Sequence, residues 1–267
     1  MRHATTAALM YHEVTDDPSS SGFQRPAARP YTLSRSAFAA HLDAVATGPL
    51  QPTLVTRVDL SRPGRHLFLT FDDGGVSAMH TAEALSHRGW LGHFFVITGR
   101  VGERTFLQPS DLRTLRSWGH VVGTHSHTHP DIFSDLPPQR METEWQLSRT
   151  VLEAWLGEPC VTGSVPGGDL SPTVVEAAAA VGLTHLFTSE PTLAPSRVFG
   201  TWVLGRLCIK RSVPAEDVAD LVRLRGWRRA QVERRLKVLA RRSLGPMYRM
   251  YVQHITTPLH TGTRESA

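Results

Sequence analysis

Two adjacent aspartates at the end of a short apolar segment constrain this chain more than any other feature. The segment Leu69-Thr70-Phe71 reads as a buried strand, and it runs directly into Asp72, Asp73 and two glycines. Neighbouring carboxylates repel each other, so such a pair at a strand end needs a cation or a proton close by. Alternate side chains of a strand point in opposite directions, so the two aspartates can take different roles at one site. A simple Asp-Asp-Gly turn is the alternative interpretation of these residues alone.

The alternation of strand-like and helix-like segments predicts the fold class. Short apolar runs recur on both sides of the aspartates, and the segments between them carry apolar residues at helical spacing. Strand and helix alternate about seven times, which favours parallel strands with crossover helices in a barrel or a doubly wound sheet. From Pro214 onward the pattern is purely helical. We therefore expect an α/β domain over residues 1–212, followed by a basic helical extension and tail over residues 213–267.

A histidine cluster is the second chemical signal. His125, His127 and His129 follow a Val-Val strand just as the aspartates follow theirs, so in a parallel sheet both groups open onto the same rim. If the segment turns helically, His125 and His129 face one way and His127 another, whereas an extended segment aligns all three. We favour the turn. Two imidazoles and one carboxylate with open positions suit a catalytic zinc or similar divalent ion. Asp72, beside the metal, could then accept a proton from water.

The positive charge of the chain is concentrated near its C-terminus. The net charge is +5, and nine basic residues crowd the segment 223–242. The apolar residues Val232, Leu236 and Leu239 form one stripe among them. A helix with a solvated cationic face is the first interpretation, and docking on an anionic membrane surface is the second. No nucleic-acid motif accompanies the charge, so we expect no nucleic-acid partner.

Several classes of protein are disfavoured by what the sequence lacks. No segment approaches the ~18 uninterrupted apolar residues of a transmembrane helix. The N-terminal apolar run is too short for a signal peptide, so we expect a cytoplasmic protein, at most peripheral to a membrane. Cys160 and Cys208 lie far apart and outside any C-x-x-C pattern, so neither a disulfide framework nor a thiolate zinc site is expected.

The two rim motifs together resemble a known family. The pairing of Thr70-Phe71-Asp72-Asp73-Gly74 with His125-Ser126-x-x-His129 is similar to the polysaccharide deacetylase, or NodB-homology, family of carbohydrate esterases. The resemblance covers roughly residues 7–210 and implies a distorted barrel of about seven parallel strands. It implies one divalent metal ion held by Asp73, His125 and His129. That metal is usually zinc, with cobalt, nickel or manganese as alternatives. Asp72 would be the general base, and Ser126 would orient the loop by hydrogen bonding.

The third motif of the family is present only in part. The family has Arg-x-Pro followed by an aromatic residue and glycine, whereas this chain has Ser164-Val165-Pro166-Gly167-Gly168-Asp169. The backbone N–H of Gly167 can still donate to an oxyanion, with Pro166 and Gly168 next to the substrate. The missing arginine leaves open how Asp72 is oriented and how its pKa is set. A simple turn is the alternative interpretation of this segment.

The general acid must also come from an unusual position. The late Leu-x-x-His motif of the family has no counterpart between Val203 and Arg211. Deacetylases of the poly-N-acetylglucosamine type resemble this chain in opening with a strand that ends in Tyr-His, and their early histidine takes the acid's place. On this resemblance His12 is the candidate acid, and a purely structural histidine is the alternative.

The resemblance implies a metal-dependent hydrolase that removes an N-acetyl group from an amino sugar in a polysaccharide or glycoconjugate. Two alternatives remain open. The substrate could be a smaller amide metabolite, because the sequence does not determine substrate size. The chain could also be a catalytically silent, sugar-binding relative, since the third-motif arginine and the late histidine are missing. The sequence gives no indication of the oligomeric state.

Overall fold

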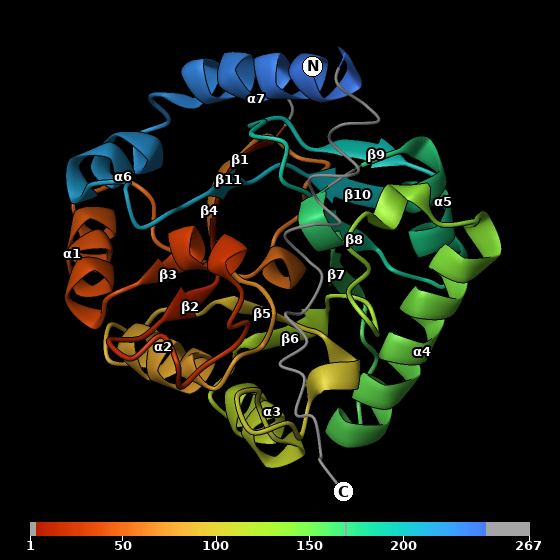
Figure 1. Ribbon diagram of the computed structural model, residues 1–267. Coiled ribbons are helices and arrows are strands. Elements are labelled where there is room, and N and C mark those ends of the chain that lie inside the picture. The colour runs from red at the N-terminus through yellow and green to blue at the C-terminus, as the bar shows by residue number, and fades with distance from the viewer. Residues whose placement is uncertain (1–3, 169, 244–267) are drawn as a thin grey trace, which may run out of the picture.

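One large sheet dominates the computed structural model, which describes residues 4–168 and 170–243 (Figure 1). Its strands are β1 (Thr5–Tyr11), β4 (Arg65–Phe71), β5 (His93–Val96), β6 (Val121–Thr124), β7 (Thr162–Ser164), β8 (His185–Phe187), β9 (Ser196–Val198), β10 (Thr201–Leu204) and β11 (Leu207–Cys208). Their spatial order is β11-β1-β4-β5-β6-β7-β8-β10-β9. All neighbouring strands run parallel except β9, which is antiparallel to β10.

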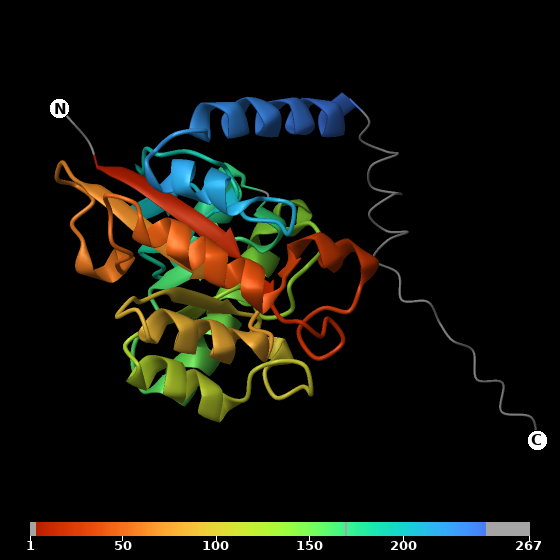
Figure 2. The ribbon, with the colours of Figure 1, turned by 90° about the vertical axis from the view of Figure 1, so that its left-hand side faces the viewer.

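Helices connect the strands and cover the outside of the curled sheet (Figures 1 and 2). They are α1 (Arg35–Ala46), α2 (Ser77–Ser86), α3 (Pro109–Ser117), α4 (Pro138–Leu156), α5 (Pro172–Ala180), α6 (Ala215–Val222) and α7 (Trp227–Ser243). Short 3-10 turns are η1 (Pro26–Tyr31), η2 (Val55–Arg57), η3 (Thr98–Arg100), η4 (Phe133–Asp135) and η5 (Pro166–Gly168). A second sheet pairs β2 (Glu13–Val14) with β3 (Thr32–Leu33).

Local signals in the sequence account for the lengths of these elements. The central strands β1 and β4 are buried over most of their length, because helices cover one face of the sheet and the interior of the curl fills the other. Helix α1 begins after Ser34, whose Oγ accepts a hydrogen bond from Ala37 N at 3.1 Å. Helix α4 ends before Gly157, which adopts the left-handed φ of 70° that glycine tolerates best. The helices between successive strands return the chain to the starting edge of the sheet, so that the strands run parallel.

The predicted fold class is confirmed, with one difference in detail. The sheet starts at β11 and ends at β9 without closing, so it forms the curled half-barrel of a distorted (β/α) barrel. Eight of its strands are parallel neighbours, rather than about seven, because the short strands β10 and β11 add to the run. Since the strands are parallel, their carboxyl ends share one rim, onto which His12, Asp72 and His125 follow β1, β4 and β6.

The C-terminal helices pack on the half-barrel. Val218 and Leu221 of α6 and Trp227 of α7 belong to the same apolar cluster as Leu9 of β1. The division at residue 213 stays a prediction, and the tail 244–267 lies outside the described residues. Within the part of the chain that the structure covers, no helix has the length and apolar character needed to cross a membrane.

Candidate metal centre and active site

Three side chains at the rim bring their donor atoms together in a metal-binding arrangement. Asp73, His125 and His129 each offer one oxygen or nitrogen atom, and these atoms all lie within 4.8 Å of one another. Asp73 Oδ1 is 3.5 Å from His125 Nε2 and 3.8 Å from His129 Nε2. Ligand atoms at zinc bonding distance are separated by about 3.4 Å in a tetrahedral site. The donor triangle of Asp73, His125 and His129 therefore fits a divalent ion, and its ligand types suit zinc.

His125 is held in the tautomer that metal binding requires. Its Nδ1 donates to Ser164 O at 2.9 Å, so Nε2 is left as the acceptor that faces Asp73. Burial lowers the pKa of His125 to about 3, which keeps the ring neutral. The pKa of Asp73 is raised, first by burial and then by the neighbouring carboxylates Asp72 and Glu13. A bound cation would reverse that rise, so the electrostatics favour an ion in the donor triangle.

The loop 125–129 turns into the site without forming a helix. Ser126 and His129 have positive φ angles of 63° and 55°, conformations that cost energy for residues with side chains and cluster at functional sites. The Oγ of Ser126 accepts a hydrogen bond from His129 N at 3.0 Å, which is the orienting contact predicted for this serine. The turn brings the rings of His125 and His129 to 4.9 Å between centroids. His127 lies outside the donor triangle, as predicted.

A buried glutamate from helix α4 anchors the same loop, and the sequence analysis missed it. Glu144 Oε2 accepts hydrogen bonds from the N–H groups of His127 and Thr128 at 3.0 and 2.8 Å. Glu144 Oε1 accepts the hydroxyl of Thr128 at 2.8 Å. Because one buried side chain accepts two backbone N–H groups and a hydroxyl, this contact restrains the loop. A charged residue within the apolar face of a helix is the sequence signal that could have identified it.

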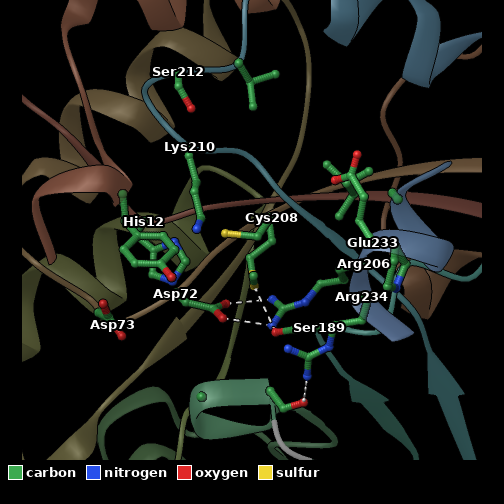
Figure 3. A pocket seen from close by; sticks show the side chains of 18 of the residues that line it. His12, Asp72, Asp73, Ser189, Arg206, Cys208, Lys210, Ser212, Glu233 and Arg234 are labelled. Carbon is green, nitrogen blue, oxygen red and sulfur yellow. Dashed lines mark hydrogen bonds and ion pairs between the residues drawn. The ribbon is translucent and has the colours of Figure 1, made fainter. Parts of the chain in front are cut away.

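Asp72 lies beside the donor triangle and is fixed by an arginine (Figure 3). Arg206 Nη1 donates to Asp72 Oδ1 at 2.7 Å, and Nη2 donates to Oδ2 at 2.8 Å. Asp72 Oδ2 is 3.8 Å from Nε2 of His125. Burial acts to raise the pKa of Asp72, but the charge and hydrogen bonds of Arg206, together with His125 and His12, outweigh it and hold the pKa below its usual range. Asp72 is therefore ionised and oriented without the third-motif arginine.

Arg206 contacts both Asp72 and the residue that stands at the sequence position of the missing arginine. At the sequence position of the family arginine stands Ser164, whose Oγ accepts from Arg206 Nη2 at 2.7 Å and donates to Asp72 Oδ2 at 3.0 Å. Arg206 is fully buried, and its remaining donors reach Thr188 O and Thr70 Oγ1, each at 3.1 Å. Its position just after the apolar segment of β10, two residues beyond the strand, is the signal that could have revealed it.

His12 follows β1 and borders the same cavity. Its ring lies 4.9 Å from that of Tyr31, measured between centroids. Its Nδ1 is buried and has no hydrogen-bond partner among the described residues. Burial lowers the pKa of His12 to about 4, while Asp72 acts to raise it and Arg206 acts to lower it further. The ring is therefore neutral near pH 7 before a substrate binds.

The partial third motif forms the 3-10 turn η5, which presents backbone to the cavity. Gly167 and Gly168 line the cavity, whereas Pro166 is buried and does not. Both glycines have positive φ, at 63° and 67°. A Cβ on Gly168 would come within 2.0 Å of Ser189 Oγ, so the close approach of this turn to the β8 loop needs glycine. Asp169 lies outside the described residues.

A cavity of about 770 Å³ contains the whole group, which is within the size range of ligand pockets. His12, Asp72, Asp73 and Arg206 line it (Figure 3). The other two residues of the donor triangle line it as well. The long loop after β1 contributes Phe23, Arg25 and Tyr31 to the wall. Helix α7 contributes a further wall through Arg229 and Arg234.

The fold recurs in several solved structures. IcaB from Ammonifex degensii matches with a TM-score of 0.67 and 22% identity, over 83% of this chain and 99% of that one. The putative polysaccharide deacetylase BA0330 from Bacillus anthracis matches with a TM-score of 0.68 and 20% identity, over 82% of this chain and 69% of that one. The deacetylase PplD of Streptococcus pyogenes, solved with acetate, has a TM-score of 0.65 and 16% identity, over 82% and 99%. These likenesses support the fold.

Sequence comparison identifies the family of the site-bearing segment. A gellan lyase from Bacillus sp. is 32% identical over 101 residues, which are 38% of this chain and only 4% of that protein. Residues 59–186 match the polysaccharide deacetylase family. That span includes Asp72, the donor triangle and Ser164, and it covers the strands from β4 to β8. Residues 59–186, which carry these site residues, therefore belong to the polysaccharide deacetylase family.

Proposed function

We propose that this protein is a metal-dependent hydrolase that removes the acetyl group from an N-acetylated amino sugar in a polysaccharide or glycoconjugate. One observation carries the proposal: an arginine-held carboxylate, Asp72, lies 3.8 Å from a nitrogen of His125, which belongs to a donor triangle fit for a divalent ion. Family membership supports the reaction class, and one structure with this fold holds acetate, the expected product. Zinc is the expected metal, and a cytoplasmic location stays a prediction.

The chain's own residues supply each proton transfer. A divalent ion at Asp73, His125 and His129 would polarise the acetyl carbonyl and lower the pKa of water. Asp72 accepts a proton from the attacking water at Oδ1, which retains a lone pair beyond its bond to Arg206, whereas Oδ2 accepts from both Arg206 and Ser164. As the water oxygen bonds to the acetyl carbon, the N–H of Gly167 donates to the carbonyl oxygen that gains negative charge.

His12 completes the reaction by protonating the nitrogen that leaves. The C–N bond breaks, its electrons stay on the nitrogen, and the proton from His12 yields the free amine together with acetate. The low pKa of His12 means that the ring must first take up a proton from the solvent. Negative charge that develops on the substrate oxygen raises this pKa during the reaction, in the same direction as Asp72 does.

Removal of metal is expected to abolish acetate release from N-acetylglucosamine oligomers. Mass spectrometry of the purified protein should find about one divalent ion per protein chain. A chelator should eliminate activity, and zinc or cobalt should restore it, because the carbonyl would otherwise lack a Lewis acid. The absence of bound metal, or activity that resists the chelator, would contradict the proposal. Tight glycan binding without turnover in the metal-loaded protein would instead support the silent relative, and a strong preference for monomeric amides would support the smaller substrate.

His12→Gln is expected to lower kcat by about a hundredfold or more, because loss of a general acid typically has that effect. Metal content should stay unchanged, since His12 is not part of the donor triangle. The matched control is His127→Gln, which alters a histidine of the metal-binding loop that lies outside the cavity. Equal activity in the wild type and His12→Gln would leave His12 with only a structural role.

A further inference from the structure

Helix α7 carries apolar side chains on the side that faces away from the protein. Val232, Leu236 and Leu239, here called the outer stripe, are 56%, 61% and 58% exposed. Their spacing of four and then three residues puts them on one face of the helix. Two views of the molecule show α7 at its periphery, with one long side turned outward (Figures 1 and 2). This is the reverse of an ordinary surface helix, which turns its apolar face inward.

The contacts of the opposite side fix this orientation. Trp227 is buried, and its Nε1 donates to Leu221 O at 3.0 Å. About two turns later, Arg234 Nε donates to Glu190 Oε1 at 2.9 Å. Arg234 Nη2 also donates to Gly168 O of the third-motif turn at 3.3 Å. Because an aromatic ring and a paired arginine hold the inner side, rotation that would bury the outer stripe would break both contacts.

Cationic side chains border the outer stripe. Arg228 and Arg235 are exposed and lie on the same flank of the stripe by their helical positions. Neither makes an ion pair with any residue that the structure describes. The sequence of α7 contains seven basic residues and only Glu233 as an acidic one. An apolar face bordered by arginines is the pattern of a helix that lies in the interface of an anionic membrane.

We propose that α7 docks on an anionic lipid surface, with the outer stripe among the upper acyl chains and Arg228 and Arg235 at the phosphate groups. Charge complementarity favours this occupant over a second copy of the chain, whose α7 would bring the same excess of arginine into contact with itself. The same helix lines the catalytic cavity through Arg229 and Arg234, so docking would hold that cavity next to the lipid surface. The docking does not depend on the proposed deacetylase reaction.

The test is flotation of the full chain with phosphatidylglycerol vesicles and with phosphatidylcholine vesicles. We expect binding to the anionic vesicles only, and weaker binding at high salt. Arg228→Gln/Arg235→Gln should weaken binding about 30-fold, since each charge near such a surface contributes about 1 kcal/mol and 1.4 kcal/mol is tenfold. The matched control is Arg104→Gln/Arg113→Gln, which removes two exposed charges elsewhere and should bind almost as the wild type does.

The apolar contribution is tested separately. Val232→Gln/Leu236→Gln should weaken binding about tenfold or more, whereas Leu147→Gln, on the exposed side of α4, should have little effect. Hydrogen exchange of residues 227–243 should slow when anionic vesicles are added. Equal binding to both lipids, or unchanged exchange in this helix, would overturn the proposal. A dimer in lipid-free solution that Leu236→Gln dissociates would also overturn it, because the outer stripe would then be an interface between copies.

Discussion

Asp72→Asn is expected to lower kcat for acetate release by about a thousandfold, within the range that loss of a general base produces. The amide cannot accept the proton that the attacking water gives up. Metal content should remain near the wild-type value, because the proposed ligands of the ion are Asp73, His125 and His129. Asp73→Ala should instead lose both metal and activity. Loss of activity in Asp73→Ala together with full activity in Asp72→Asn would refute this division of roles.

A fold defect in Asp72→Asn must be separated from loss of the base. The amide leaves the guanidinium of Arg206 buried without a full countercharge, which destabilises the folded state. The double variant Asp72→Asn/Arg206→Met removes that unpaired charge, so we expect it to regain thermal stability over the single variant. Its activity should stay as low as that of Asp72→Asn. Recovery of activity together with stability would show that Asp72 serves only to neutralise the buried charge of Arg206.

The residues that the sequence predicts well are those that follow recognisable strands. Asp72 directly follows the seven-residue strand β4, and His125 directly follows β6, so parallel pairing alone brings them to one rim. Alternation of strands and helices was long enough to indicate the α/β class. The sequence predicted that a turn at 125–129 brings His125 and His129 to one side, but it predicted a helical turn. The structure instead brings the two histidines together through positive φ angles at Ser126 and His129.

The residues that the sequence does not reveal act across long separations. Arg206 is 134 residues from Asp72 and follows β10, a strand of four residues that is too short for a periodic signal. Glu144 belongs to a helix whose pattern predicts only that one face is buried, not that a carboxylate on it will reach a loop. The stripe of α7 was visible in the sequence, but its outward direction depends on Trp227 and Arg234, which hold the other side.

Arg206→Met is expected to destabilise the folded protein by about 3–5 kcal/mol, the usual cost of removing one partner of a buried ion pair. The side chain of Arg206 is 0% exposed and that of Asp72 is 2% exposed, so water cannot replace the lost contact. The low pKa of Asp72 stabilises the fold at pH values above the ordinary carboxyl pKa, and this stabilisation is lost as the pH falls. The loss of stability in Arg206→Met should therefore be largest near neutral pH and should shrink in acid. Denaturant unfolding at several pH values measures this.

The same variant separates positioning of the base from simple packing through the pH profile of activity. Without Arg206, burial dominates and raises the pKa of Asp72, so the acid limb of kcat/KM should move to higher pH. Arg206→Lys keeps the positive charge but loses the two-pronged contact with both carboxylate oxygens. It should therefore retain an acid limb close to that of the wild type while kcat falls, because orientation is lost and charge is not. An acid limb that stays fixed in Arg206→Met would mean that Arg206 supports the fold but does not set the ionisation of Asp72.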